Sequence, residues 1–194
     1  MKKKSSNTKS KIVSAAWRLF YENGYEDTTI DEIISLSGTS RGSFYHYFEG
    51  KDALLGSLAD LFDEEYVKLL DVLPDDKNRF EALMWLNFSL FSMIENSIDF
   101  SLLTLMYSTQ LTTKGEKTLL DHDRVYYKTI KKLVLEGQER GEISSSFPAH
   151  EIVKVYAMCE RALLYDWCLV KGEYSLSEYA KKMMPILLSS YKNG

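Results

Sequence analysis

Apolar side chains recur every three or four positions along most of the chain, which is the spacing that places them on one face of an α-helix. Only three prolines and ten glycines interrupt these stretches, and no convincing strand pattern is present. The sequence therefore predicts an all-α fold of about nine helices. Their approximate ranges are 7–23, 29–37, 41–48, 51–73, 77–94, 97–109, 116–140, 150–171 and 175–191.

The second and third predicted helices are short and are separated by the turn 38–40. Thr29 and Glu32 have the spacing of a capping box, in which each side chain satisfies a free backbone N–H of the other residue. Gly38 suits a tight turn, and Ser40 is a suitable N-cap for the next helix. This spacing predicts a helix-turn-helix.

The third predicted helix carries aromatic residues on more than one face. Phe44 and Phe48 lie four positions apart, so they share a face and are expected to be buried. Ser43, His46 and Tyr47 are expected on a polar outer face of the kind that reads a DNA major groove. An ordinary helical hairpin is the alternative, but an exposed face this rich in aromatic residues would be unusual in one.

The segments 38–48 and 51–55, preceded by 24–30, resemble the DNA-binding signature of the TetR/AcrR family of bacterial transcriptional regulators. The resemblance covers about residues 9 to 56. It implies a helix-turn-helix DNA-binding domain of three helices over residues 1–50. It also implies a helical effector-binding and dimerisation domain over residues 51–194.

The helix pattern and the resemblance together indicate a set of DNA-binding residues. Arg41 could pair with guanine or bind a phosphate, and Gly42 would allow the helix to approach the groove closely. Thr29 and Lys51 stand at helix starts, where free N–H groups favour phosphate. The expected contacts are Thr29, Ser40, Arg41, Gly42, Ser43, Tyr45, His46, Tyr47 and Lys51.

The formal net charge of −4 is unevenly distributed along the chain. Residues 1–51 contain 8 Lys/Arg and 6 Asp/Glu, a net charge of +2, whereas residues 52–194 contain 16 and 22, a net charge of −6. A basic end on an acidic body is consistent with an N-terminal DNA contact.

The last two predicted helices are separated by residues 172–174, a connection that forces an antiparallel hairpin. Two such hairpins could form a four-helix bundle between subunits, as in similar regulators, and a dimer would read a palindrome. The alternative is that the apolar hairpin surface packs against the chain's own helices. The expected interface residues are Tyr156, Cys159, Leu163, Tyr179, Met183, Ile186 and Leu187.

The resemblance also implies a pocket for a small-molecule effector in the C-terminal domain. Aromatic and methionine side chains could form its walls, although such residues at helical spacing are more often ordinary core. The candidate lining residues are Trp85, Phe88, Phe91, Met106, Tyr107, Tyr126, Tyr127 and Trp167.

Other classes of function have little support in the sequence. His122 lies between two aspartates, but adjacent helical side chains point in different directions and cannot converge on one metal ion. We therefore expect no enzyme, no metal and no cofactor. No secretory signal or membrane span is evident, and Cys159 and Cys168 are too far apart along one helix for a disulfide. A cytoplasmic protein is expected.

The function implied by the resemblance is that of a homodimeric transcriptional regulator that binds a double-stranded DNA operator. Repression is the expected outcome, with release by the effector. The alternative is a ligand-independent DNA-binding or adaptor protein whose C-terminal domain only dimerises.

Overall fold

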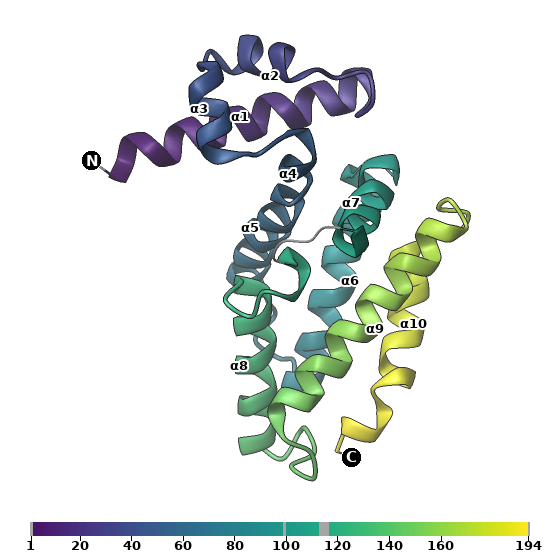
Figure 1. Ribbon diagram of the computed structural model, residues 1–194. Helices are drawn as coiled ribbons and strands as arrows, with labels where there is room; N and C mark the ends of the chain where they lie inside the picture. Colours follow the sequence, from purple (N-terminus) through teal and green to yellow (C-terminus); the bar gives the residue numbers. More distant parts are fainter. Residues whose placement is uncertain (1, 99, 113–116, 194) are drawn as a thin grey trace. The chain divides into compact units, whose positions relative to one another are not determined.

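The computed structural model describes residues 2–98, 100–112 and 117–193. Within these ranges the regular structure is helical, apart from an isolated β-bridge between Ile143 and Lys192, which confirms the all-α prediction (Figure 1). The helices are α1 (Lys2–Asn23), α2 (Ile30–Ser37), α3 (Arg41–Tyr47), α4 (Lys51–Leu55), α5 (Ser57–Asp71), α6 (Arg79–Ser97), α7 (Phe100–Thr112), η1 (Thr118–Leu120), α8 (Val125–Glu139), α9 (Ala149–Leu169), α10 (Leu176–Leu187) and η2 (Ser189–Tyr191).

The chain divides into two compact units. The first comprises Met1–Asp60 and Ser101–Lys114, and the second comprises Leu61–Phe100 and Gly115–Gly194. The first unit therefore extends beyond the 1–50 range expected for a DNA-binding domain, because it includes α4 and most of α7. The boundary at residue 60 falls within α5, so this helix contributes residues to both units.

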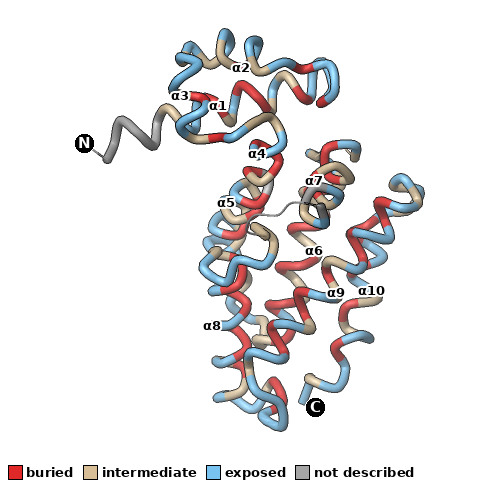
Figure 2. The backbone as a smooth tube through the Cα atoms, in the orientation of Figure 1, coloured by how far each residue is buried: buried red, intermediate tan, exposed pale blue. Residues whose placement is uncertain are grey.

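The core of the first unit is built mainly from the inner faces of α1 to α4. Gly24 ends α1 in the left-handed conformation, with φ of +86°, as the sequence predicts. One side chain from α7 joins this core, a contact that local sequence patterns do not reveal. Figure 2 shows the buried positions along these helices. The buried cluster comprises Ile12, Ala15, Ala16, Phe20, Tyr25, Ile33, Phe44, Phe48, Leu54, Leu55 and Leu102.

The prediction of one continuous helix over residues 51–73 is wrong, because two helices, α4 and α5, meet at Gly56. The hydroxyl of Ser57 donates a 2.5 Å hydrogen bond to the carbonyl oxygen of Leu54 and accepts one of 2.8 Å from the Trp17 indole N–H. The Ser57 side chain therefore satisfies the Leu54 carbonyl oxygen at the break, and it also connects the break to α1 through Trp17.

The predicted seventh helix begins later than the sequence indicated. Its expected first residue, 116, lies outside the described residues, and α8 begins at Val125 after the short helix η1. The carboxylate of Asp63, on α5, accepts hydrogen bonds of 3.2 Å from the backbone N–H groups of Val125 and Tyr126. It also pairs with the Arg124 guanidinium at 2.8 Å. A residue more than sixty positions away thus fixes the start of α8 by capping its free N–H groups.

Helix α6 begins with a capping box formed by Asn78 and Glu81, and eight of its residues are buried, as expected for a central helix. Helices α9 and α10 form the predicted hairpin, with Gly172 at φ of +72° in the turn. Ser175 and Glu178 have the spacing of a capping box, but only half of it is formed. Ser175 caps the helix, while the carboxylate of Glu95 accepts the N–H and hydroxyl hydrogen bonds of Ser177.

Candidate functional site

The helix-turn-helix begins with the predicted capping box of α2. The hydroxyl of Thr29 accepts a 3.2 Å hydrogen bond from the Glu32 N–H, and the Glu32 carboxylate accepts a 2.7 Å bond from the Thr29 N–H. The Glu32 carboxylate accepts hydrogen bonds from the backbone and from the side chain of Thr29. These two bonds, the backbone one first, lower the pKa of Glu32. The carboxylate therefore stays charged at the positive end of the helix.

The turn between α2 and α3 follows the predicted chemistry. Gly38 has φ of +62°, the left-handed conformation that few other residues adopt readily. Ser40 caps α3, because its hydroxyl accepts a 3.1 Å hydrogen bond from the Ser43 N–H. The two serine hydroxyls also lie 2.9 Å apart. Ser43 is therefore already hydrogen-bonded within the turn and is only half-exposed.

Helix α3 has a buried face and an exposed face. Phe44 is fully buried and Phe48 nearly so, which confirms the prediction that both belong to the core. The expected outer face was partly wrong, since Tyr47 is half-buried against the core cluster. The residues of α3 that are exposed are Arg41, Gly42, Tyr45 and His46.

Arg41 supplies the positive charge on this exposed face. Its guanidinium lies 3.2 Å from the carboxylate of Asp31 on α2, and both side chains are largely exposed. An exposed ion pair of this kind is weak, so a DNA phosphate or guanine could replace Asp31 at little cost. An added Cβ on Gly42 would meet only the Ser40 hydroxyl, at 3.9 Å, so this stretch of α3 presents an open backbone surface.

The side chain of Lys51 makes its contacts within the protein. Its ammonium group donates hydrogen bonds to the carbonyl oxygens of Tyr25 at 2.6 Å, Glu26 at 3.2 Å and Thr28 at 3.0 Å. All three ammonium hydrogens are therefore used within the protein. The Lys51 side chain therefore holds the loop that leads into α2, while the expected phosphate contact of the N–H groups at the start of α4 stays a prediction.

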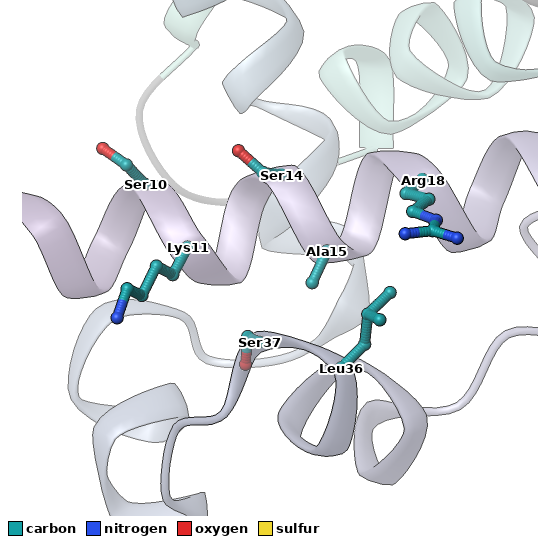
Figure 3. A pocket seen from close by; sticks show the side chains of 7 residues that line it. All are labelled: Ser10, Lys11, Ser14, Ala15, Arg18, Leu36 and Ser37. Carbon is teal, nitrogen blue, oxygen red and sulfur yellow. The ribbon is translucent and has the colours of Figure 1, made fainter.

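A broad hollow of about 500 Å³ lies between α1 and the end of α2 (Figure 3). Figure 3 shows Lys11 and Arg18 on α1, and Leu36 and Ser37 on α2, around it. The guanidinium of Arg18 is paired with Glu22 at 2.9 Å. The hollow is open to solvent, unlike a site that encloses a ligand.

A buried polar cluster, which sequence patterns hardly indicate, occupies the second unit. Glu160 on α9 is 4 % exposed and accepts hydrogen bonds from the Tyr126 hydroxyl at 2.5 Å and the Asn87 amide at 2.8 Å. Tyr156, one turn earlier on α9, donates a 2.9 Å bond to the carbonyl oxygen of Leu83. The ring of Tyr66 packs edge-on against Tyr126. The cluster joins α5, α6, α8 and α9.

The ionisation of this cluster is strongly perturbed. Burial raises the pKa of Glu160, although hydrogen bonds from Tyr126 and Asn87 partly oppose that effect. Burial, followed by the nearby charge of Glu160, raises the pKa of Tyr66, Tyr126 and Tyr156. The side-chain oxygen of Asn87 is buried without a hydrogen-bond partner, which is uncommon in a protein interior. Perturbed carboxyl groups of this kind occur both in binding sites and in structural polar networks.

The residues predicted to line an effector pocket are divided between the two units. Tyr126 and Tyr127 are buried in the second unit, where the Tyr127 hydroxyl accepts a hydrogen bond from Arg161, and Phe91 is fully buried in its core. Met106 belongs to the first unit, as does Tyr107. The other three are elsewhere in the second unit: Trp85 and Phe88 line a cleft beside α10, and Trp167 packs against Phe100.

The predicted dimer residues likewise fall into two groups. Tyr156 and Leu163 are buried within the chain's own core, so they cannot form a surface, and this part of the prediction is wrong. Cys159 and Met183 are half-buried. The exposed apolar residues of the hairpin are Met158, Tyr165 and Leu169 on α9, and Tyr179, Ile186 and Leu187 on α10.

Membrane-spanning helices and metal-binding clusters are both missing from the part of the chain that the structure describes. None of their helices is long and apolar enough to cross a membrane. Nor do they contain a group of three or more histidine, cysteine, aspartate or glutamate residues placed to hold a metal ion.

The chain is similar to known regulatory proteins along its length. The family described as bacterial regulatory proteins, tetR family, matches residues 12–58. The uncharacterized HTH-type transcriptional regulator YvdT of Bacillus subtilis is 31 % identical over 90 residues, which are 39 % of this chain and 46 % of that protein. The HTH-type transcriptional regulator HbdR of Aromatoleum is 25 % identical, with 93 % of this chain and 79 % of that protein aligned. The chain therefore spans less than half of YvdT.

Solved structures show the same fold. Thermus thermophilus FadR, described as a TetR family transcriptional repressor in complex with lauroyl-CoA, superposes with a TM-score of 0.72. It is 23 % identical, and the superposition covers 92 % of each chain. The matched helix-turn-helix and the shared all-α fold lead to one conclusion: residues 12–58 match the tetR family of bacterial regulatory proteins, and the chain as a whole has the fold of a solved TetR family repressor.

Proposed function

We propose that this protein is a cytoplasmic, homodimeric transcriptional repressor that binds a palindromic DNA operator and is released by a small-molecule effector. The observation that carries the proposal is the surface of α3, where Arg41, Gly42, Tyr45 and His46 are exposed while Phe44 is buried. A helix with this arrangement can enter a major groove while its other face stays anchored in the core.

DNA binding involves two kinds of contact in this proposal. Arg41, Tyr45 and His46 reach base edges or phosphates from the exposed face of α3, and the backbone at Gly42 lies close to the groove. The start of α2 at Thr29 faces phosphate through its free N–H groups. Ser40, Ser43 and Lys51 shape the turn and the loop before α2, and they support the reading face indirectly.

Dimerisation is supported by the exposed apolar surface of the α9–α10 hairpin. Met158, Tyr165 and Leu169 are spaced by seven and four residues, so they form one stripe along α9. Ile186, which is 58 % exposed, and Leu187 extend the surface on α10. Exposed apolar residues on both helices of the hairpin favour an interface, and a two-fold dimer would place half-sites about 34–36 Å apart.

The Glu160 cluster is our candidate for the polar part of the effector site. Its carboxyl group and the unused oxygen of Asn87 would meet hydrogen-bond donors of the effector, while the surrounding tyrosine rings provide apolar contact. For release, the effector must bind the DNA-free arrangement more tightly than the DNA-bound one. Helix α5, which carries Tyr66 and contributes to both units, would transmit the change.

Selection of bound sequences from random duplex DNA, at a stated salt concentration, tests the proposed function. We expect a palindrome whose half-sites are separated by about one helical turn. Any bound ligand is first extracted from the protein. If the folded dimer then enriches no sequence, the proposed function is contradicted.

A ligand-independent regulator remains the second candidate. A thermal-shift screen separates the two, because a ligand that binds only the folded protein raises its melting temperature. A compound that stabilises the wild type but not Glu160→Gln would support the effector site. Compounds that act equally on both proteins would place the effector away from Glu160.

A further inference from the structure

A cleft of about 330 Å³ lies between α6 and the C-terminal end of the chain, outside the Glu160 cluster. Its walls are mostly apolar, and its rim carries three lysines and one glutamate. The lining residues are Lys77, Phe80, Glu81, Met84, Trp85, Phe88, Lys181, Pro185 and Lys192. A cleft of this size accommodates part or all of a small organic molecule.

The positive groups around this cleft lie over its aromatic walls. The Lys181 ammonium is 4.9 Å from the centroid of the Phe88 ring, and that of Lys192 is 5.7 Å from the centroid of Phe80. These distances are typical of cation–π contacts, which keep an ammonium group beside an apolar surface. Lys181 also has a weak surface pair with Glu178 at 3.7 Å.

The one acidic residue of the lining offsets only part of the charge of its three lysines. The carboxylate of Glu81 accepts a 3.2 Å hydrogen bond from the Asn78 N–H as part of the α6 capping box. The cleft therefore combines a positive rim with aromatic walls, although residues 52–194 carry a net charge of −6. Local charge of this sign favours an anionic ligand.

The cleft would remain open in the proposed dimer. Successive residues of a helix are rotated by about 100°, so Lys181 and Pro185 share one side of α10, while Tyr179 and Ile186 lie on the opposite side. A partner helix on the dimer side would leave the other side accessible.

We propose that this cleft binds a small amphipathic anion, with a flat aromatic body against Trp85 and Phe88 and its acidic group beside Lys181 and Lys192. Burial of the apolar body supplies the main driving force, and the lysines select for negative charge. The proposal goes beyond the proposed function, because it assigns a second ligand site that is separate from the Glu160 cluster.

The probe for this site is 1-anilinonaphthalene-8-sulfonate, an aromatic anion whose fluorescence rises on transfer to an apolar surface. N-Phenyl-1-naphthylamine has the same body without the sulfonate group and is the matched neutral probe. We expect the double variant Lys181→Gln, Lys192→Gln to weaken sulfonate binding about tenfold, because two partly exposed charge contacts are lost. Binding of the neutral probe should change little.

Two further variants locate the site. Lys182→Gln removes an exposed lysine that does not line the cleft, and it should bind both probes as the wild type does. Trp85→Ala removes an aromatic wall of the cleft and should weaken the binding of both probes. If the lysine and Trp85 variants all bind the sulfonate like the wild type, the proposal is wrong. Neither result depends on DNA binding, so failure here leaves the proposed function untouched.

Discussion

The ammonium group of Lys51 lies 4.2 Å from the centroid of the Tyr25 ring and donates a 2.6 Å hydrogen bond to the carbonyl oxygen of the same residue. The Tyr25 hydroxyl in turn hydrogen-bonds to Asp52, next to Lys51. Burial, followed by this bond, raises the pKa of the Tyr25 hydroxyl. The start of α4 and the loop before α2 are therefore held together by one compact set of polar contacts.

Lys51→Ala should destabilise the first unit by about 1.5–3 kcal/mol, the usual contribution of hydrogen bonds to a charged group. Its effect on DNA affinity should follow from loss of the loop geometry. Thermal unfolding of the variant measures this, with Lys11→Ala, an exposed lysine of α1, as the control. Wild-type stability with reduced DNA affinity would instead indicate that Lys51 is a direct phosphate ligand.

Gly42→Ala should change folding stability and DNA affinity in opposite directions. An added Cβ meets only the Ser40 hydroxyl at 3.9 Å, so the folded protein has room for it. Replacing glycine by alanine within a helix stabilises it by about 0.5–1 kcal/mol. The same methyl group would stand between α3 and the groove and weaken DNA binding. Unchanged or tighter binding to DNA would show that α3 does not approach DNA at Gly42.

Glu160→Gln should reduce the dependence of stability on pH. Burial raises the pKa of Glu160 in the folded protein above the ordinary value of 4.5. The stability contributed by the bound proton is therefore fully present below pH 4.5 and is lost as pH rises through the folded pKa. Melting temperatures of both proteins from pH 4.5 to about 8, the usual range of maximal stability, measure this loss. A wild-type curve that is no steeper than the variant's would contradict the prediction.

Asp63→Asn should destabilise the second unit by about 3 kcal/mol, because it leaves the largely buried Arg124 guanidinium unpaired. It should also weaken the first turn of α8, because the Asp63 carboxylate accepts hydrogen bonds from the N–H groups of that turn. Asp60→Asn is the control, since Asp60 is exposed and lies 3.8 Å from Lys9. Equal effects of the two substitutions on thermal unfolding would rule out this role for Asp63.

Ile186→Asp should separate the proposed dimer, because it places a charge in the middle of the apolar hairpin surface. Sedimentation at micromolar concentration measures the molecular mass of the variant. Val72→Asp is the matched control, since Val72 is an equally exposed apolar residue on a different surface. A dimeric Ile186→Asp protein would require another interface.

The helix-turn-helix could be predicted from the sequence because its determinants are local. The Thr29–Glu32 capping box, the left-handed Gly38 and the Ser40 cap each act within three or four residues. Phe44 and Phe48 could be assigned to the core for the same reason, since helical spacing alone places them on one face.

The features that the sequence did not reveal depend on contacts between distant residues. Lys51 binds carbonyl groups 23 to 26 positions away, and Asp63 caps a helix more than sixty positions away. Neither contact leaves a periodic signal. Glu160 had one local signal, a lone carboxylate four residues after Tyr156 on an apolar helical face, but its partner Asn87 lies 73 residues earlier.

The central claim is that two copies of α3 read two half-sites of one operator. Fluorescence anisotropy of the selected palindrome, compared with a duplex in which one half-site is scrambled, tests it most directly. We predict two subunits per duplex and an affinity loss of at least about a hundredfold on scrambling, since each mismatched base pair costs about 1–3 kcal/mol. Equal affinity for the two duplexes at physiological salt would contradict the account, because only non-specific phosphate contacts would then remain.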